Sequence, residues 1–291
     1  MPKGELASRL IVAAIGIPMA VIIIYGGGWY LGTMMVLASG VSAAEYYSMA
    51  AVRGSKPLRW VGIPLAMALP AFATVYPTYQ DFSQMAFALV LAAVLLAMAV
   101  SLWLRWPDGQ PLVAAATTVT GAVYTGGTLS FWILLRALPE QSSMAATAFD
   151  GAVLLIFPIW VTWLGDSFAY GFGTRFGKSK LIKSVSPKKT ILGSVGGLAG
   201  AVAVGALYSW LWLSSVPVCG LSLLAAAGVS GLIASVGQIG DLAESVIKRE
   251  AGVKDSSNLL PGHGGALDRL DALYFTVPFT YALFILMQGL S

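Results

Sequence analysis

Long apolar segments alternate with short polar ones along the whole chain. A bilayer core needs about 20 mostly apolar residues per helix. Because backbone polar groups in hydrocarbon need internal partners, such segments form helices rather than open strands. The pattern predicts nine membrane-spanning helices, at residues 10–25, 29–52, 60–76, 85–104, 112–135, 151–172, 191–213, 221–239 and 273–290.

Composition excludes a soluble domain. Hydrophobic residues make up 57% of the 291 residues and charged residues only 10%, and the mean hydropathy is +0.80. A soluble domain is usually about 25% charged. We therefore expect an all-α polytopic membrane protein. Residues 1–291 would form a single integral-membrane domain, in which residues 1–150 contribute the N-terminal spans.

Positive charges give the nine spans an orientation. Sixteen of the 17 lysines and arginines fall in the N-terminal segment and the even-numbered loops, and Arg136 is the exception. Lysine and arginine concentrate on the cytoplasmic side of membrane proteins. The N-terminus is therefore predicted to be cytoplasmic and the C-terminus outside. The predicted location is the inner (cytoplasmic) cell membrane, as a multi-pass protein.

Most candidate chemistry lies in the predicted cytoplasmic loop 240–272. It holds six of the 13 carboxylates and the only histidine, His263. Asp241, Glu244, Ser245 and Lys248 share one face if the eighth span continues as a helix. Asp268 and Asp271 would do the same before the ninth span. The glycine-rich turn 261–265, which lies between these two groups of residues, would bring backbone N–H groups close to a ligand.

Carboxylates without additional histidines or cysteines suit magnesium or manganese rather than zinc. Neighbouring lysines and arginines can neutralise phosphate charge. This combination indicates phosphoryl or nucleotidyl transfer at the cytoplasmic face. Non-catalytic interpretations also fit these residues. Asp268 and Asp271 could form a solvated helix end, and His263 could be a structural residue. The basic loop 173–190 could serve as a topology signal or contact lipid headgroups.

Two acids lie inside predicted spans, where carboxylates are costly and are usually functional or paired. Asp166 is near the cytoplasmic end of span six, beside the basic loop, which favours a role at the site. Glu45 is near the cytoplasmic end of span two, and snorkelling and structural pairing are equally compatible with its position.

The loop resembles a known family signature. Residues 245–271, reading SVIKREAGVKDSSNLLPGHGGALDRLD, are similar to the signature of CDP-diacylglycerol synthase, also called phosphatidate cytidylyltransferase. Upstream segments also resemble that family, namely GDSFAY at 165–170, FGK at 176–178, SPKKT at 186–190 and GQIGDLAES at 237–245. The resemblance covers about residues 165–271.

The resemblance implies a magnesium-dependent reaction of CTP with phosphatidate at the membrane lipid surface, giving CDP-diacylglycerol and pyrophosphate. It implies Asp241, Asp268 and Asp271 as metal ligands, with potassium as a possible second cation. It also implies a homodimer. No nucleic acid is expected among the partners.

The remaining predicted site residues divide into two groups. Lys248, Arg249, His263 and Arg269 are assigned to catalysis, as groups that neutralise or donate to phosphates. Substrate binding is assigned to Asp166, Ser186, Lys188, Lys189, Glu244, Ser245, Lys254, Gly264 and Gly265.

Two other classes remain open. One is a CTP-using enzyme acting on another lipid, such as a polyprenol kinase or an archaeal-type lipid cytidylyltransferase. The other is a cation-coupled transporter. Transporters place ionisable groups near the membrane midplane, whereas here six of the 13 acids lie in one predicted cytoplasmic loop and only Glu45 and Asp166 lie within predicted spans.

Overall fold

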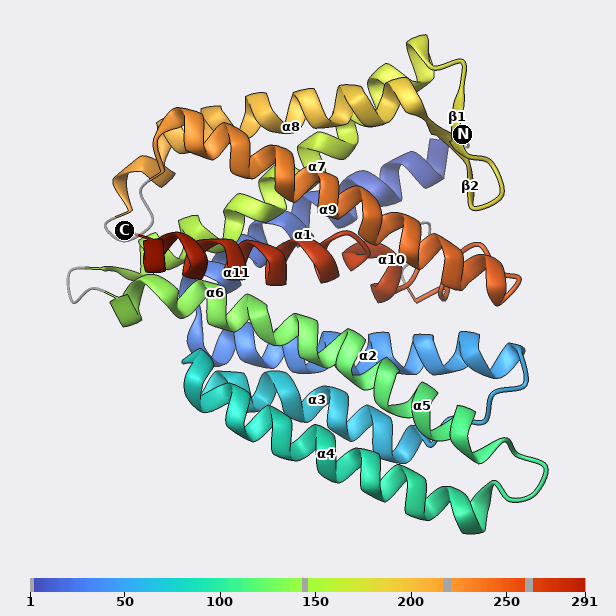
Figure 1. Ribbon diagram of the computed structural model, residues 1–291. Coiled ribbons are helices and arrows are strands. Elements are labelled where there is room, and N and C mark those ends of the chain that lie inside the picture. The colour runs from blue at the N-terminus through green and yellow to red at the C-terminus, as the bar shows by residue number, and fades with distance from the viewer. Residues whose placement is uncertain (1–2, 143–145, 217–220, 260–263, 291) are drawn as a thin grey trace. The chain divides into compact units, whose positions relative to one another are not determined.

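A computed structural model describes residues 3–142, 146–216, 221–259 and 264–290 (Figure 1). Helices account for nearly all of the regular structure in these ranges. The helices are α1 (Lys3–Gly26), α2 (Gly28–Val52), α3 (Arg59–Val75), α4 (Tyr79–Leu104), α5 (Pro111–Ala122), α6 (Thr128–Ser142), α7 (Ala148–Phe176), α8 (Ile191–Leu211), α9 (Leu223–Glu250), α10 (Ala266–Leu270) and α11 (Leu273–Leu290), with a π-helical turn η1 (Val123–Gly127), a 3-10 turn η2 (Leu213–Ser215) and the strands β1 (Lys180–Ile182) and β2 (Ser186–Thr190).

Six helical runs in the described ranges are long and apolar enough to cross a membrane. Four of them are the single helices α4, α7, α8 and α9. The other two are the continuous run formed by α5 and α6 and the run formed by α10 and α11. Helices α1 and α3 contribute shorter apolar stretches. An all-α polytopic membrane protein is thereby confirmed, whereas the number nine and the orientation stay predictions.

The chain divides into two compact units. Unit 1 comprises residues Met1–Leu134 and Ile247–Leu270, and unit 2 comprises Leu135–Val246 and Asp271–Ser291. The region 165–271 that resembles the family signature contributes to both units. Each unit is described by itself below.

Unit 1 is built on α2 to α5, with the end of α9 and the short α10. Figure 1 shows α2, α3 and α4 side by side, which their mutual contacts support. Tyr47 of α2 is fully buried in the core of this unit. Its hydroxyl donates a hydrogen bond of 2.6 Å to the backbone oxygen of Thr118. A buried tyrosine hydroxyl needs such a partner, so this bond fixes α2 against α5.

Unit 2 rests on the close packing of α7 with α8. A Cβ atom added at Gly197 of α8 would lie 2.8 Å from the side chain of Ala169 on α7. Small residues at such contacts let helix backbones approach closely, which is how membrane helices gain packing energy. This packing holds the C-terminal part of α7 and its charged residues in a defined position.

The basic segment 173–190 is more ordered than the loop predicted from the sequence. Helix α7 continues to Phe176, and β1 and β2 then form an antiparallel hairpin in which Lys180 lies opposite Thr190. Thr190 ends the hairpin and caps α8, because its hydroxyl accepts a hydrogen bond of 3.1 Å from the backbone N–H of Gly193. The cap sets where the hairpin meets the helix.

Candidate active site

Asp268 of α10 lies at the centre of a cluster of polar groups in unit 1 that includes Lys248 and Ser256. Its side chain is only 5% exposed, and its Oδ1 is 2.7 Å from Nζ of Lys248, at the C-terminal end of α9. A buried ion pair of this kind resists change, since removing one partner leaves a buried charge and typically costs about 3–5 kcal/mol. The sequence assigned these two residues to one site, and the structure brings them into contact.

Two described backbone groups, one before the glycine-rich turn and one at its end, contact Asp268. The backbone N–H groups of Ser256 and Gly265 each donate to Oδ2 of Asp268 over 2.8 Å. Gly264 has a φ of +80°, a backbone conformation that glycine adopts without strain, and a Cβ there would lie 2.6 Å from Oδ2. The glycines thus let the backbone approach Asp268 closely, and the predicted approach to a ligand stays a prediction.

Glu45 of α2 belongs to the same polar cluster in unit 1. It is 6% exposed and accepts hydrogen bonds from Ser256, Ser257 and the start of α10. Of the two roles that the sequence left open, structural pairing is the one observed.

Asp241 of α9 forms an ion pair with Lys189 of β2 within unit 2. The two side chains are 26% and 28% exposed. The hydroxyl of Ser245 lies 3.5 Å from Oδ1 of Asp241, one turn along the helix. The β-hairpin thus places one of its lysines beside Asp241, a predicted metal ligand.

Asp166 of α7 shares this charged environment. The carboxylates of Asp241 and Asp271 and the ammonium group of Lys189 all act electrostatically on Asp166. Beside Asp166, a cavity of about 10 Å³ is lined by Gln238 and by small residues of α7, α8 and α9. That volume is about the size needed for one water molecule. Unit 2 therefore gathers three carboxylates and one lysine from four segments of the chain.

The chemistry of these donors fits magnesium held together with a phosphate substrate. In the described ranges, no three His, Cys, Asp or Glu side chains stand close enough to hold a metal by themselves. Magnesium commonly takes only one or two protein carboxylates and completes its shell with water and substrate phosphate oxygens. Oxygen donors flanked by lysines match that pattern, and they do not match a zinc site.

The other predicted site residues lie in contrasting environments. Glu244 is fully buried and Ser245 nearly so. Arg249 is exposed and donates a hydrogen bond of 3.2 Å to the backbone oxygen of Val253. Asp166, Lys188, Lys254 and Arg269 are also exposed, while Ser186 begins β2 and is half-buried. His263 lies outside the described residues.

Sequence reasoning gave Ser256 and Ser257 no role. Both lie within the quoted signature, and both contact Glu45 through their hydroxyl groups. The sequence feature that could have indicated such partners was Glu45, because a carboxylate inside a predicted apolar helix needs hydrogen-bond donors. What the sequence could not supply was the identity of those donors, which come from the opposite half of the chain.

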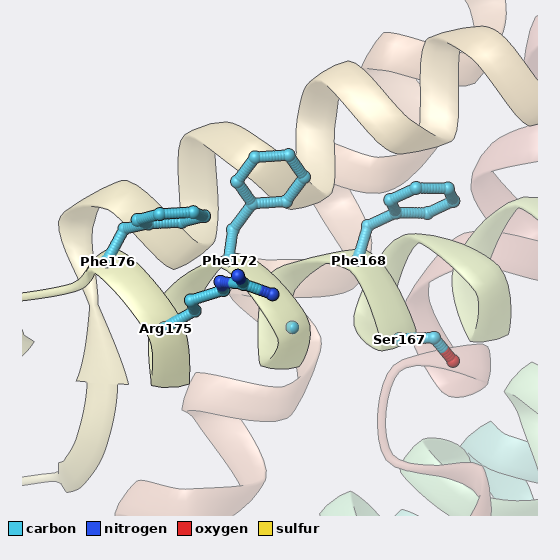
Figure 2. A pocket seen from close by; sticks show the side chains of 6 residues that line it. Ser167, Phe168, Phe172, Arg175 and Phe176 are labelled. Carbon is cyan, nitrogen blue, oxygen red and sulfur yellow. The ribbon is translucent and has the colours of Figure 1, made fainter.

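A groove of about 380 Å³ runs along the C-terminal end of α7. Figure 2 shows the rings of Phe168, Phe172 and Phe176 on the same side of the helix, with Arg175 beside them. The guanidinium carbon of Arg175 lies 5.7 Å from the ring centroid of Phe176. The groove is therefore lined mainly by aromatic rings, with one cation at its edge.

The long apolar helices and the ion pairs of Asp268 with Lys248 and of Asp241 with Lys189 indicate an integral-membrane protein with polar clusters. The chain matches the Cytidylyltransferase family over residues 7–287 and belongs to that family. It is 32% identical over 302 residues to a phosphatidate cytidylyltransferase of Synechocystis sp., covering 96% of each protein. It is also 32% identical to phosphatidate cytidylyltransferase 4, chloroplastic, of Arabidopsis thaliana, covering 96% of this chain and 73% of that protein. A phosphatidate cytidylyltransferase of Bacillus subtilis is 36% identical over 167 residues, covering 57% of each protein.

Proposed function

We propose that the protein is a phosphatidate cytidylyltransferase. An oxygen of the phosphatidate phosphate attacks the α-phosphorus of CTP, and the bond to the β-phosphate breaks. The products are CDP-diacylglycerol and pyrophosphate. The observation that carries this proposal is the family match over nearly the whole chain, together with a relative named phosphatidate cytidylyltransferase that aligns with 96% of it.

We assign the metal site to Asp241, Asp268 and Asp271, with Mg²⁺ as the divalent ion and potassium as a possible second cation. When bound, magnesium supplies positive charge that offsets the triphosphate. Support comes from the oxygen-only donor set and from the electrostatic grouping of Asp241 and Asp271 around Asp166. Lys189 and Lys248 balance two of these carboxylates when substrate phosphates are elsewhere.

The basic residues would bind and orient the two polyanions. Phosphatidate is already anionic near neutral pH, so its oxygen needs no strong general base, and the main difficulty is to bring two anions together. We assign phosphate neutralisation to Lys248, Arg249 and Arg269, and a donated hydrogen bond to His263. Substrate binding is assigned to Asp166, Ser186, Lys188, Lys189, Glu244, Ser245, Lys254, Gly264 and Gly265. The exposure of Lys188, Lys254 and Arg269 leaves them accessible to a ligand from solution.

A labelling experiment tests the reaction. Purified protein is incubated with phosphatidate, Mg²⁺ and CTP labelled either in the α- or in the γ-phosphate. We expect only the α-label in the lipid product, and loss of product after EDTA treatment that added Mg²⁺ reverses. The γ-label in the lipid would identify a lipid kinase instead. Substrate uptake by sealed vesicles without conversion would identify a transporter, and full activity after chelation would contradict the metal assignment.

We further propose nine spans in a single integral-membrane domain, with the N-terminus and the site on the cytoplasmic side of the inner membrane. The distribution of lysines and arginines supports this orientation. A homodimer is proposed from the family resemblance.

Cysteine labelling tests this topology. In a Cys219→Ala background, a membrane-impermeant maleimide added to intact cells should label Gln141→Cys and should not label Ser184→Cys until the membrane is opened. Gln141 lies near the end of α6 and Ser184 lies in the hairpin turn, and both side chains are exposed. Labelling of Ser184→Cys in intact cells would reverse the proposed orientation.

A further inference from the structure

The strongest unassigned feature is the carboxylate of Glu45. It comes from α2, far upstream of the signature loop, and lies outside the region 165–271 that resembles the family. Figure 1 shows α2 and α10, which contact each other in unit 1. Burying a carboxylate is costly unless it is fully hydrogen-bonded, and Glu45 is 6% exposed. The donors that offset this cost therefore indicate what Glu45 does.

Four donors surround this carboxylate. Oε1 accepts from the hydroxyl of Ser257 at 2.6 Å and from the backbone N–H of Ala266 at 3.1 Å. Oε2 accepts from the hydroxyl of Ser256 and from the backbone N–H of Leu267, both at 2.9 Å. An ionised carboxylate offers about four lone-pair sites. Each oxygen of the Glu45 carboxylate therefore has one serine hydroxyl and one backbone N–H within hydrogen-bonding distance.

These bonds join α2 to residues on either side of the glycine-rich turn 261–265. Ser256 and Ser257 precede the turn, and Ala266 and Leu267 follow it at the start of α10. Two of the otherwise unpaired N–H groups at the beginning of α10 thereby find an acceptor. Glu45 also lines a pocket of about 360 Å³ together with Ser256, Ser257 and Leu259. The bonds therefore fix a wall of that pocket as well as the described residues on either side of the turn.

Ser256 connects Glu45 directly to Asp268. Its hydroxyl oxygen lies 2.9 Å from Oε2 of Glu45 and 2.9 Å from Oδ2 of Asp268. A hydroxyl has a single hydrogen to donate, so it can donate to only one of the two carboxylates at a time. The backbone N–H of Ser256 is directed at Asp268 in either case. The orientation of Asp268 is thus coupled to the carboxylate on α2 through one serine.

We propose that Glu45 is a positioning residue of the cytidylyl-transfer site, which fixes the signature loop and holds Asp268 in the orientation needed to bind the divalent ion. This inference rests on the proposed function. It gives the N-terminal half of the chain a role at the site beyond membrane anchoring.

The test compares Glu45→Gln with Asp150→Asn. Asp150 is a matched control, because it is a carboxylate only 9% exposed that accepts hydrogen bonds from the backbone N–H and the hydroxyl of Thr147. Both variants should lower the melting temperature. Only Glu45→Gln should raise the Mg²⁺ concentration for half-maximal thermal stabilisation, by about 10- to 100-fold, as expected for groups that orient metal ligands. Turnover should fall over the same range.

Ser256→Ala provides a second variant should Glu45→Gln fail to fold. It removes the bridging hydroxyl and keeps the backbone bond to Asp268, so a smaller shift of the Mg²⁺ midpoint in the same direction is expected. Mg²⁺ midpoints in both variants that equal the wild-type value would overturn the proposal, as would an equal shift in Asp150→Asn. Failure of the proposed function is distinguishable, because the wild-type protein would then make no CDP-diacylglycerol from α-labelled CTP.

Discussion

Asp271→Asn is expected to lower cytidylyl transfer by about 10²- to 10³-fold while the protein still inserts and folds. A metal ligand stabilises developing charge by several kcal/mol, and a tenfold change in rate corresponds to about 1.4 kcal/mol. The fold should survive because Oδ1 of Asp271 accepts a 2.7 Å bond from the backbone N–H of Ala272. An asparagine oxygen can accept the same bond.

The measurement is turnover of the purified variant with phosphatidate and α-labelled CTP, beside its melting temperature. Asp108→Asn is the control, since Asp108 is an exposed carboxylate on a loop outside the proposed site. Asp268→Asn should differ from Asp271→Asn by losing stability as well as activity, because it breaks the buried pair with Lys248. Wild-type turnover in Asp271→Asn would remove this residue from the metal assignment.

Gly265→Ala should be nearly inactive even though it changes no charge. A Cβ at this position would overlap Ser256 Oγ and both carboxylate oxygens of Glu45. Forcing an extra carbon into a packed site costs about 1–3 kcal/mol. A displacement of about 1 Å in a catalytic segment can cost about 10²-fold in rate. The expected result is a lower melting temperature and a loss of turnover of about that size.

Gly228→Ala is the matched control for this variant. Gly228 lies in α9, and apart from its chain neighbours and the nearby backbone of its own helix no atom lies within 4 Å of the position its Cβ would take, so alanine there should leave turnover unchanged. If Gly265→Ala retained full activity and stability, the packing of Glu45 and Ser256 against the turn would not be required for function.

The sequence by itself determined the class of the protein. Long apolar segments can satisfy their backbone groups in lipid only as helices, so the helical architecture followed from hydropathy. The signature at residues 245–271 carried the family, and the family match over residues 7–287 confirmed it. Asp268 and Lys248 were assigned to one site because carboxylates and lysines together suit a metal and phosphate.

Only the tertiary structure decided which partners those residues take. Lys189 pairs with Asp241 because the basic segment folds into a hairpin, which a charge count does not reveal. Glu45, near the beginning of the chain, binds Ser256 and the start of α10, near its end. Hydrophobic and helical periodicity are local properties of the chain. A hydrogen bond between distant segments depends on how the helices pack, and the sequence pattern of each segment alone does not contain that information.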